Sequence, residues 1–214
     1  MAYRRTPAVQ ARLDAQRAAV LQAAVTLLAE RGYAGCSMAA VAERAGIATG
    51  SMYRHFSGKA DLSVQLFRSV VGREVAAVTE AVARETGPTR RIAAVVETFA
   101  ARALKAPRLA YALLAEPADP DVDAERLVFR RAFRDVIAAQ IADAVAGGSL
   151  PPQDPQLAAA ALVGAIGEAL VGPLAAGEQP DDLIPALTAF ALRAVGAPTH
   201  PSPTARGARH AVDA

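Results

Sequence analysis

Apolar residues recur with the period of an α-helix along most of the chain. In the segment 14–31, Leu21, Ala24, Val25 and Leu28 follow the spacing i, i+3, i+4, i+7, which places them on one face of a helix. Gly32 comes directly after this segment and is a suitable C-terminal stop. The pattern therefore predicts a first helix with one buried face.

Two short helices are predicted next, at 37–45 and from Thr49 to Phe56, with Gly46 between them. Ser37 and Thr49 are residue types that cap helix N-termini. Ser57-Gly58 ends the second helix, and Lys59 opens a longer one that reaches about Glu85. Further helices are expected at about 89–105, 107–115, 124–146, 154–175 and 181–196, because proline- or glycine-containing segments separate apolar stretches there.

Composition supports an all-α fold. The chain has 214 residues, 53% of them hydrophobic, and it has no tryptophan. Alanine dominates the apolar share, and alanine loses no side-chain entropy in a helix. We expect a flexible basic arm at 1–12, a DNA-binding domain at 13–60, a ligand-binding and dimerisation domain at 61–196, and a disordered tail at 197–214.

Positive charge is concentrated in the first sixty residues. They contain eight Lys or Arg and three Asp or Glu, a net charge of +5, whereas residues 61–214 carry −3. Such asymmetry indicates that the N-terminal part meets an anionic polymer or surface. The arm arginines, Arg4, Arg5 and Arg12, are candidates for a minor-groove or backbone contact.

Targeting and redox features favour a cytoplasmic protein. The single cysteine, Cys36, excludes an internal disulfide framework, and the basic N-terminus has no apolar segment typical of a secretory signal. The segment 155–177 contains only one charged residue, Glu168, but its Ala, Gly and Pro173 make it a poor membrane span. We interpret it as a buried interface helix, so no membrane partner is expected.

Two short helices joined at a glycine, followed by a third helix, are typical of a helix-turn-helix DNA reader. Thr49-Gly50-Ser51 supplies two hydroxyls and little bulk, so the second helix can enter a major groove. The stretch from Ser37 to Phe56, with Ser57 to Leu62 after it, resembles the DNA-binding segment of TetR-type regulators over about residues 14–66. The resemblance implies an all-α homodimer with a variable C-terminal ligand-binding domain.

The resemblance also implies roles for three residues. Tyr53 and His55 correspond to family residues that touch phosphates, and Lys59 to a lysine that clamps one. The alternatives are a half-buried aromatic residue, an exposed helical histidine and a solvated lysine. Met52 and Phe56 are expected in the core because they lie four apart. From residue type and position alone, further candidates for DNA contact are Ser37, Arg44, Thr49, Gly50, Ser51 and Arg54. For Ser37, Thr49, Gly50 and Ser51 the alternative is capping and turn chemistry, which for Ser37 and Thr49 is compatible with DNA contact. For the arginines the alternative is a solvated face.

The sequence of this segment does not show which bases are recognised. The start of the predicted recognition helix lacks Arg, Asn and Gln, the side chains that read guanine or adenine with two hydrogen bonds.

The middle helices contain the aromatic candidates for an effector pocket. They are Phe99, Tyr111, Phe129 and Phe133, with Arg130 beside the last two. The alternative is that these aromatic residues belong to an ordinary core with no pocket.

Helices 154–175 and 181–196 are the expected dimer interface, where Ala160, Gly164 and Gly167 permit close approach of the helices.

An enzyme is not expected, and neither a cofactor nor a bound metal is predicted. The sequence has no glycine-rich phosphate loop and no His/Cys set with metal spacing. Asp119, Asp121 and Asp123 lack the register of a calcium loop. The expected partners are double-stranded operator DNA, a second copy of the chain and a small-molecule effector. The favoured function is a ligand-responsive repressor; the alternatives are an activator and a non-specific architectural DNA-binding protein.

Overall fold

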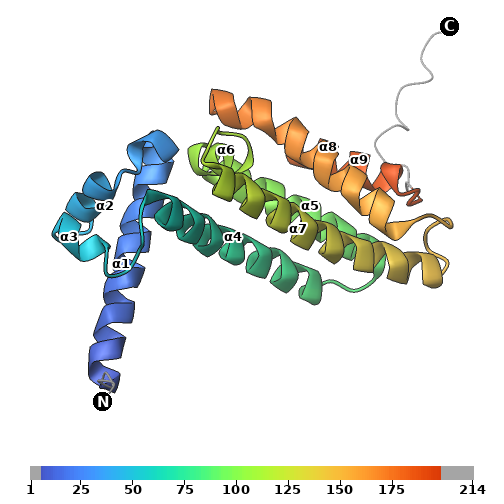
Figure 1. Ribbon diagram of the computed structural model, residues 1–214. Helices are drawn as coiled ribbons and strands as arrows, with labels where there is room; N and C mark the ends of the chain where they lie inside the picture. Colours follow the sequence, from blue (N-terminus) through green and yellow to red (C-terminus); the bar gives the residue numbers. More distant parts are fainter. Residues whose placement is uncertain (1–5, 199–214) are drawn as a thin grey trace, which may run out of the picture.

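The computed structural model describes residues 6–198, and all regular structure within them is helical (Figure 1). The N-terminal elements are α1 (Pro7–Arg31), a 3-10 turn (Tyr33–Gly35), α2 (Met38–Arg44) and α3 (Thr49–Met52). The remaining helices are α4 (Lys59–Arg84), α5 (Pro88–Lys105), α6 (Pro107–Leu114), α7 (Pro120–Ala146), α8 (Pro155–Ala176) and α9 (Leu183–Ala194). The prediction of an all-α fold is confirmed.

Two parts of the molecule are distinguished in Figure 1. The head (residues 7–58) holds α1, α2 and α3 at one end, and the bundle (α4–α9) extends away from it. Helix α4 starts at the head and continues through the bundle, where it packs on α5 and α7. Helices α1 and α6 also pack together, so the head contacts the bundle at two places.

One buried core runs through both parts. In the head, Val20, Leu28 and Val41 are fully buried, as the helical spacing requires for an internal face. In the bundle, Phe129 makes edge contacts with Phe67 at 6.2 Å and Phe133 at 4.7 Å between ring centroids. Edge-to-face pairs at these separations are favourable beyond the area they bury. The continuous core links the position of the head to packing inside the bundle.

The predicted flexible arm is wrong for residues 7–12, which belong to α1. Thr6 is extended and its hydroxyl accepts a hydrogen bond from the amide of Val9, while Pro7 occupies the first turn, where its missing N–H costs nothing. A helix therefore starts seven residues before the predicted Asp14. Arg4 and Arg5 lie outside the described residues, as do residues 199–214 of the predicted tail.

Other predicted boundaries differ less. Helix α7 begins at Pro120 rather than near residue 124, because extended Asp119 precedes a proline at the first helical position. The predicted tail begins too early, since Ala197 is buried against the core.

Helix α8 is long and apolar enough to cross a membrane by length and composition, and within residues 6–198 it is the one helix that passes this test. Its inner residues, including Leu162, Ile166 and Leu170, are buried in the bundle. Leu157 is 70% exposed, and Ala161, Gly164 and Glu168 continue its exposed face. The apolar character of α8 therefore comes from two faces, only one of which this chain covers.

Candidate nucleic-acid interface and ligand cavities

The turn between α2 and α3 is built on Gly46. Its φ of +67° lies in the left-handed region, and no atom lies within 4 Å of the position that a Cβ would take. The amide of Gly46 donates to the carbonyl of Glu43 at 3.1 Å, and that of Ile47 donates to Ala42 at 3.0 Å. These two bonds form a Schellman motif, which closes the C-terminus of α2. The predicted glycine turn is present.

Helix α3 is shorter than predicted. It spans Thr49–Met52, and the chain continues to Phe56 through turns in which the amides of His55 and Phe56 donate to the carbonyl of Met52. The expectation that Thr49 is the N-cap is wrong: Ala48 holds that position and offers no side-chain cap. Thr49 is therefore the first helical residue, and its exposed hydroxyl is not committed to capping.

Two buried anchors fix the direction of this segment. Met52 and Phe56 are 0% and 1% exposed, as predicted, and they hold the inner side of α3 against the head. Tyr53 lies between them in sequence and is 60% exposed. Thr49 and Gly50 are exposed as well. The apolar side of the segment is thus fully used in the core, and its small and hydroxyl-bearing side faces solvent.

The two other polar residues of this segment have partners within the head. The Nε2 atom of His55 lies 3.0 Å from the amide oxygen of Gln16 on α1, and the side chain is half-buried. The guanidinium of Arg54 donates to the hydroxyl of Ser51 at 3.1 Å. The guanidinium of Arg17 lies 5.6 Å from the centre of the Phe56 ring. Sequence reasoning missed Gln16 and Arg17, because they are distant in sequence from α3.

The first turn of α2 lies in the head, and the first turn of α4 directly follows it in the chain. The hydroxyl of Ser37 accepts from the amide of Ala40 at 3.1 Å, so Ser37 caps α2 as predicted. Lys59 is the first residue of α4 and is exposed. Asp61, two residues on, accepts from the amide of Ser57 at 2.8 Å and holds the preceding turn. An exposed cation and free backbone amides thus meet at the start of α4.

Arg44 forms an ion pair with Glu30 within the head. Its two terminal nitrogens lie 2.9 and 2.6 Å from the carboxylate oxygens of Glu30 on α1. Hydrogen bonding to Arg44 lowers the pKa of the Glu30 carboxyl below its ordinary value. Because the two charges offset each other, Arg44 contributes less positive potential than its sequence position suggests.

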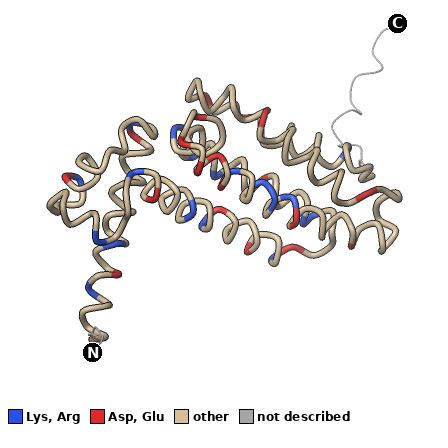
Figure 2. The backbone as a smooth tube through the Cα atoms, in the orientation of Figure 1, with Lys and Arg blue, Asp and Glu red and all other residues tan. Residues whose placement is uncertain are grey.

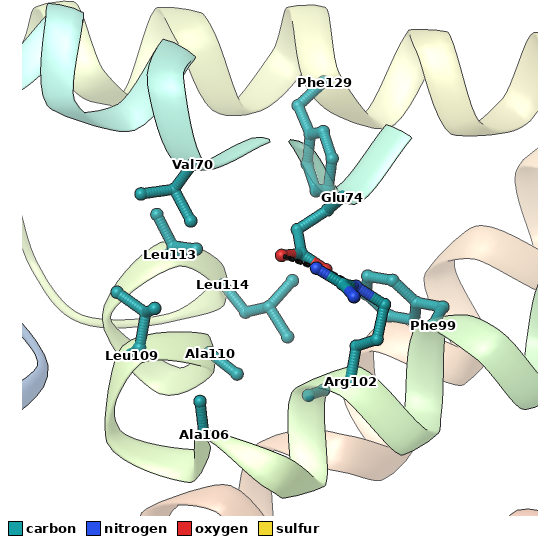
Figure 3. A pocket seen from close by; sticks show the side chains of 11 residues that line it. Val70, Glu74, Phe99, Arg102, Ala106, Leu109, Ala110, Leu113, Leu114 and Phe129 are labelled. Carbon is teal, nitrogen blue, oxygen red and sulfur yellow. Dashed lines mark hydrogen bonds and ion pairs between the residues drawn. The ribbon is translucent and has the colours of Figure 1, made fainter. Parts of the chain in front are cut away.

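Two small cavities lie inside the bundle. The first is about 50 Å³ and is bounded by α4, α5, α6 and α7; the second is about 40 Å³ and is bounded by α5, α6, α7 and α8. Phe99, Leu114 and Phe129 line both, so these three side chains form the partition between them. Figure 3 shows the first cavity, with the ion pair of Glu74 and Arg102 at its side.

Four of the five predicted pocket residues line these cavities: Phe99, Phe129, Arg130 and Phe133. Tyr111 does not; it is half-buried and packs against the core. Sequence reasoning missed the aliphatic wall formed by Val70, Leu109, Leu113 and Leu114. No sequence signal separates such residues from ordinary core, because pockets and cores share the same composition.

The loop after α6 fastens the bundle to the head. The carboxylate of Glu116 accepts from the amide of Tyr33, directly after α1, at 3.0 Å. Arg126 on α7 secures that loop, because its guanidinium donates to the carbonyls of Ala112, Leu113 and Glu116. The guanidinium of Arg108 on α6 also donates to the carbonyl of Glu30, at 3.0 Å. Helix α6, which lines the first cavity, is therefore tied directly to the head.

No metal centre is formed in the part of the chain that the structure describes: no group of three or more His, Cys, Asp and Glu side chains is placed to hold an ion. Cys36 is buried, with its sulfur 3.4 Å from the carbonyl oxygen of Gly32. Burial raises the pKa of the Cys36 thiol to about 11. The thiol is therefore a core group rather than a nucleophile at neutral pH.

Comparison with known proteins agrees with this architecture. A family model described as bacterial regulatory proteins, tetR family, matches residues 20–66. The HTH-type transcriptional activator FasR of Mycolicibacterium smegmatis is 34% identical over 86 residues, 40% of this chain and 39% of that protein. The fatty acid metabolism regulator protein of Bacillus subtilis is 29% identical over 77 residues, 36% of this chain and 40% of that one. The chain spans about two fifths of the length of these curated relatives.

A solved structure extends the likeness to most of the chain. The transcriptional regulator FadR from Bacillus subtilis, crystallised in complex with stearoyl-CoA, superposes with a TM-score of 0.73 at 21% identity. The match covers 84% of this chain and 97% of FadR. At this identity the match establishes the fold, and the segment that matches the family model comprises most of the head and the first turns of α4. The N-terminal segment thus matches the tetR family model over residues 20–66, and the all-helical architecture has the fold of FadR.

Proposed function

We propose that the chain is a DNA-binding transcriptional regulator that acts as a homodimer and is released from its operator by a small apolar or amphiphilic effector. The observation that carries the DNA-binding part is the division of the α3 segment into two sides. Met52 and Phe56 are buried, whereas Thr49, Gly50 and Tyr53 are exposed. A slim exposed helix start with hydroxyl groups suits entry into a major groove.

Phosphate contacts supply the affinity in this proposal. Lys59 begins the 26-residue helix α4, where the helix dipole disfavours a cation unless an anion lies nearby. A DNA phosphate would satisfy both the lysine and the free amides of the first turn. Tyr53 presents its hydroxyl to solvent and can donate to a phosphate oxygen. Ser37, Ser51, Arg54 and His55 border this surface and are further contact candidates.

The homodimer rests on the uncovered face of α8. Leu157, Ala161 and Glu168 are exposed residues of this helix, and Phe190 on α9 is 42% exposed. A twofold packing of α8 and α9 would bury these residues and place two heads on one duplex. Of the small residues predicted at this interface, Gly167 lines the second cavity, and Ala160 and Gly164 line a recess between α7 and α8. A covered α8 also supports a cytoplasmic protein rather than a membrane span.

The effector site proposed is the pair of cavities in the bundle. Together they are far smaller than the roughly 300–1,000 Å³ of typical ligand sites, so an effector must part Phe99, Leu114 and Phe129 to occupy both. A long acyl chain suits such a narrow apolar path, and FadR, which shares this fold, was crystallised with stearoyl-CoA. Displacing Leu114 would move α6, which is bonded to the head through Glu116 and Arg108.

Repression is the favoured direction of control, because effector entry strains the contact between α6 and the head and so disturbs the DNA-binding geometry. Activation is the second candidate, since one relative of the head, FasR, is named an activator. A non-specific architectural DNA-binding protein, the remaining alternative, would need neither an effector cavity nor a helix α3 shaped to enter a major groove.

Fluorescence anisotropy with the DNA upstream of the gene tests the DNA-binding proposal. Tyr53→Ala and Lys59→Ala should each weaken binding about tenfold, the effect of losing one hydrogen bond to phosphate. Arg73→Gln, an exposed change on α4 in the bundle, is the control and should bind as the parent does. Circular dichroism should show unchanged folding. Unchanged affinity in both head variants would contradict the proposed interface.

A further inference from the structure

A basic recess lies on the outside of the bundle between α7 and α8. It has a volume of about 300 Å³ and is lined by Leu127, Arg130, Arg131, Arg134, Ala160, Val163 and Gly164. No acidic residue is among the lining residues, and the small side chains of α8 leave the space in front of the arginines open. Figure 2 shows the corresponding blue segments in the middle of α7.

The arginines of this recess are not used to hold the fold together. Arg134 pairs with its sequence neighbour Asp135, and Arg130 and Arg131 form no ion pair with any residue from 6 to 198. In contrast, Arg68 and Arg102 each bridge two helices through a carboxylate. Arg130 and Arg134 are four residues apart, a spacing at which like charges repel on a helix. Asp135 offsets the charge of Arg134, and the recess keeps the charges of Arg130 and Arg131 without a carboxylate partner among residues 6–198.

The recess adjoins the apolar interior. Arg130 and Val163 line both the recess and the second cavity, so these two side chains form the boundary between them. Beyond that boundary the cavity wall is apolar and leads to the partition at Phe99 and Phe129. A positively charged outer site and an apolar inner site thus share one wall, an arrangement that matches an amphiphile with an anionic head.

We propose that Arg130, Arg131 and Arg134 bind the phosphate-bearing head of an amphiphilic effector whose acyl chain enters the adjoining cavity. This inference rests on the proposed function, because it assumes that the cavities accept an acyl chain. Guanidinium groups bind phosphate oxygens through paired hydrogen bonds, and three of them around one recess favour a head with several phosphates over a single carboxylate. Bound phosphate also removes the repulsion between Arg130 and Arg134.

Isothermal titration calorimetry of the full chain with three probes tests the assignment. The probes are palmitoyl-CoA, palmitate, and the palmitoyl thioester of N-acetylcysteamine, which has the acyl chain but no phosphate, all below their micelle-forming concentrations. Palmitoyl-CoA should bind at least about tenfold more tightly than the other two, the effect of one or more charge-assisted hydrogen bonds. Its affinity should fall with rising salt, whereas that of the neutral thioester should not.

Arg131→Gln and Arg134→Gln should each weaken palmitoyl-CoA about tenfold and leave the neutral thioester unchanged, because both side chains line the recess and neither lines the second cavity. Arg84→Gln, at the end of α4 and paired with Glu80, is the matched control and should bind all three probes as the parent does. Sedimentation of each variant separates a lost head site from a lost dimer, because an altered oligomeric state would assign the arginines to the subunit interface and overturn the proposal.

The outcomes distinguish this inference from the proposed function. Equal affinity for palmitoyl-CoA and the neutral thioester, with no effect of the arginine substitutions, overturns the head site while the acyl-chain cavity stands. Binding of none of the three probes overturns both the head site and the acyl-chain effector. The DNA titrations with Tyr53 and Lys59 variants are unaffected by either result.

Discussion

Substitution of Gly32 by alanine probes the junction between the head and the bundle. Gly32 ends α1 with φ +65° and ψ −171°, a region that side chains rarely adopt. A Cβ at this position would lie 2.7 Å from Oε2 and 2.8 Å from Cδ of Glu116. Glu116 would have to turn away and give up its hydrogen bond to the amide of Tyr33. The substitution therefore adds a backbone cost to a lost contact between the two parts.

The size of the effect follows from these two terms. A non-glycine residue in this backbone region costs about 1–3 kcal/mol, for which we take about 2. A hydrogen bond to a charged group contributes about 1.5–3 kcal/mol, and the lower value applies because Glu116 is half-buried. Gly32→Ala should thus lower the free energy of unfolding by about 3.5 kcal/mol in the parent chain. In a Glu116→Ala background it should cost only the backbone part, about 2 kcal/mol.

Urea denaturation followed by circular dichroism, at one fixed protein concentration, measures all four chains of this double-mutant cycle. Gly46→Ala is the matched control: φ is +67° there too, but a Cβ would meet no atom within 4 Å. Its cost should be the backbone cost alone, with or without Glu116. Strictly additive costs for Gly32→Ala and Glu116→Ala would refute the reasoning, because the carboxylate and the new methyl group could not then compete for one space.

Three further predictions concern the head core, the buried thiol and the α8 face. Met52→Ala should lower the free energy of unfolding by about 2–5 kcal/mol in urea denaturation. The Cys36 thiol should react with a thiol reagent far more slowly in the folded than in the denatured chain at pH 8. Its pKa in the folded chain, about 11, exceeds the ordinary value of 9.0, so the protonated thiol stabilises the fold below pH 9. That contribution to the free energy of unfolding should be lost between pH 9 and 11, and Cys36→Ala should show no such loss. Leu157→Glu should shift the sedimentation of the chain from dimer to monomer, since it places a charge on the proposed interface.

Local features of the fold are readable from the sequence because local rules determine them. The helical period of residues such as Ala24 and Leu28 and the backbone freedom of Gly46 each act within a few residues. Ala24 and Leu28 are buried and Gly46 has a positive φ, as predicted, whereas Leu21 of the same predicted face is half-buried. The helix boundaries are less secure because capping decides them. Thr6 and Pro7 extend α1 beyond its apolar pattern, and Thr49 loses the cap position to Ala48, whose backbone is extended.

Contacts between distant residues account for what the sequence could not predict. Arg44 meets Glu30 fourteen positions away, and Tyr33 meets Glu116 eighty-three positions away, so neither pairing has a local signal. The residues that line the cavities are also hard to predict from the sequence. Their aromatic residues could be proposed because aromatics are few, whereas aliphatic residues such as Leu114 resemble every other core position. Arg131 lines the recess but had no sequence signal, because one arginine on a helix is most often solvated.

The central claim is that two copies of the head read one duplex through the segment from Thr49 to Lys59. Selection of bound sequences from random duplex DNA tests it most directly, because the result reports DNA recognition and twofold symmetry together. We expect enrichment of an inverted repeat whose half-sites lie about one helical turn, or a multiple of it, apart. Recovery of no common sequence, or of a single unrepeated site bound by a monomer, would contradict it.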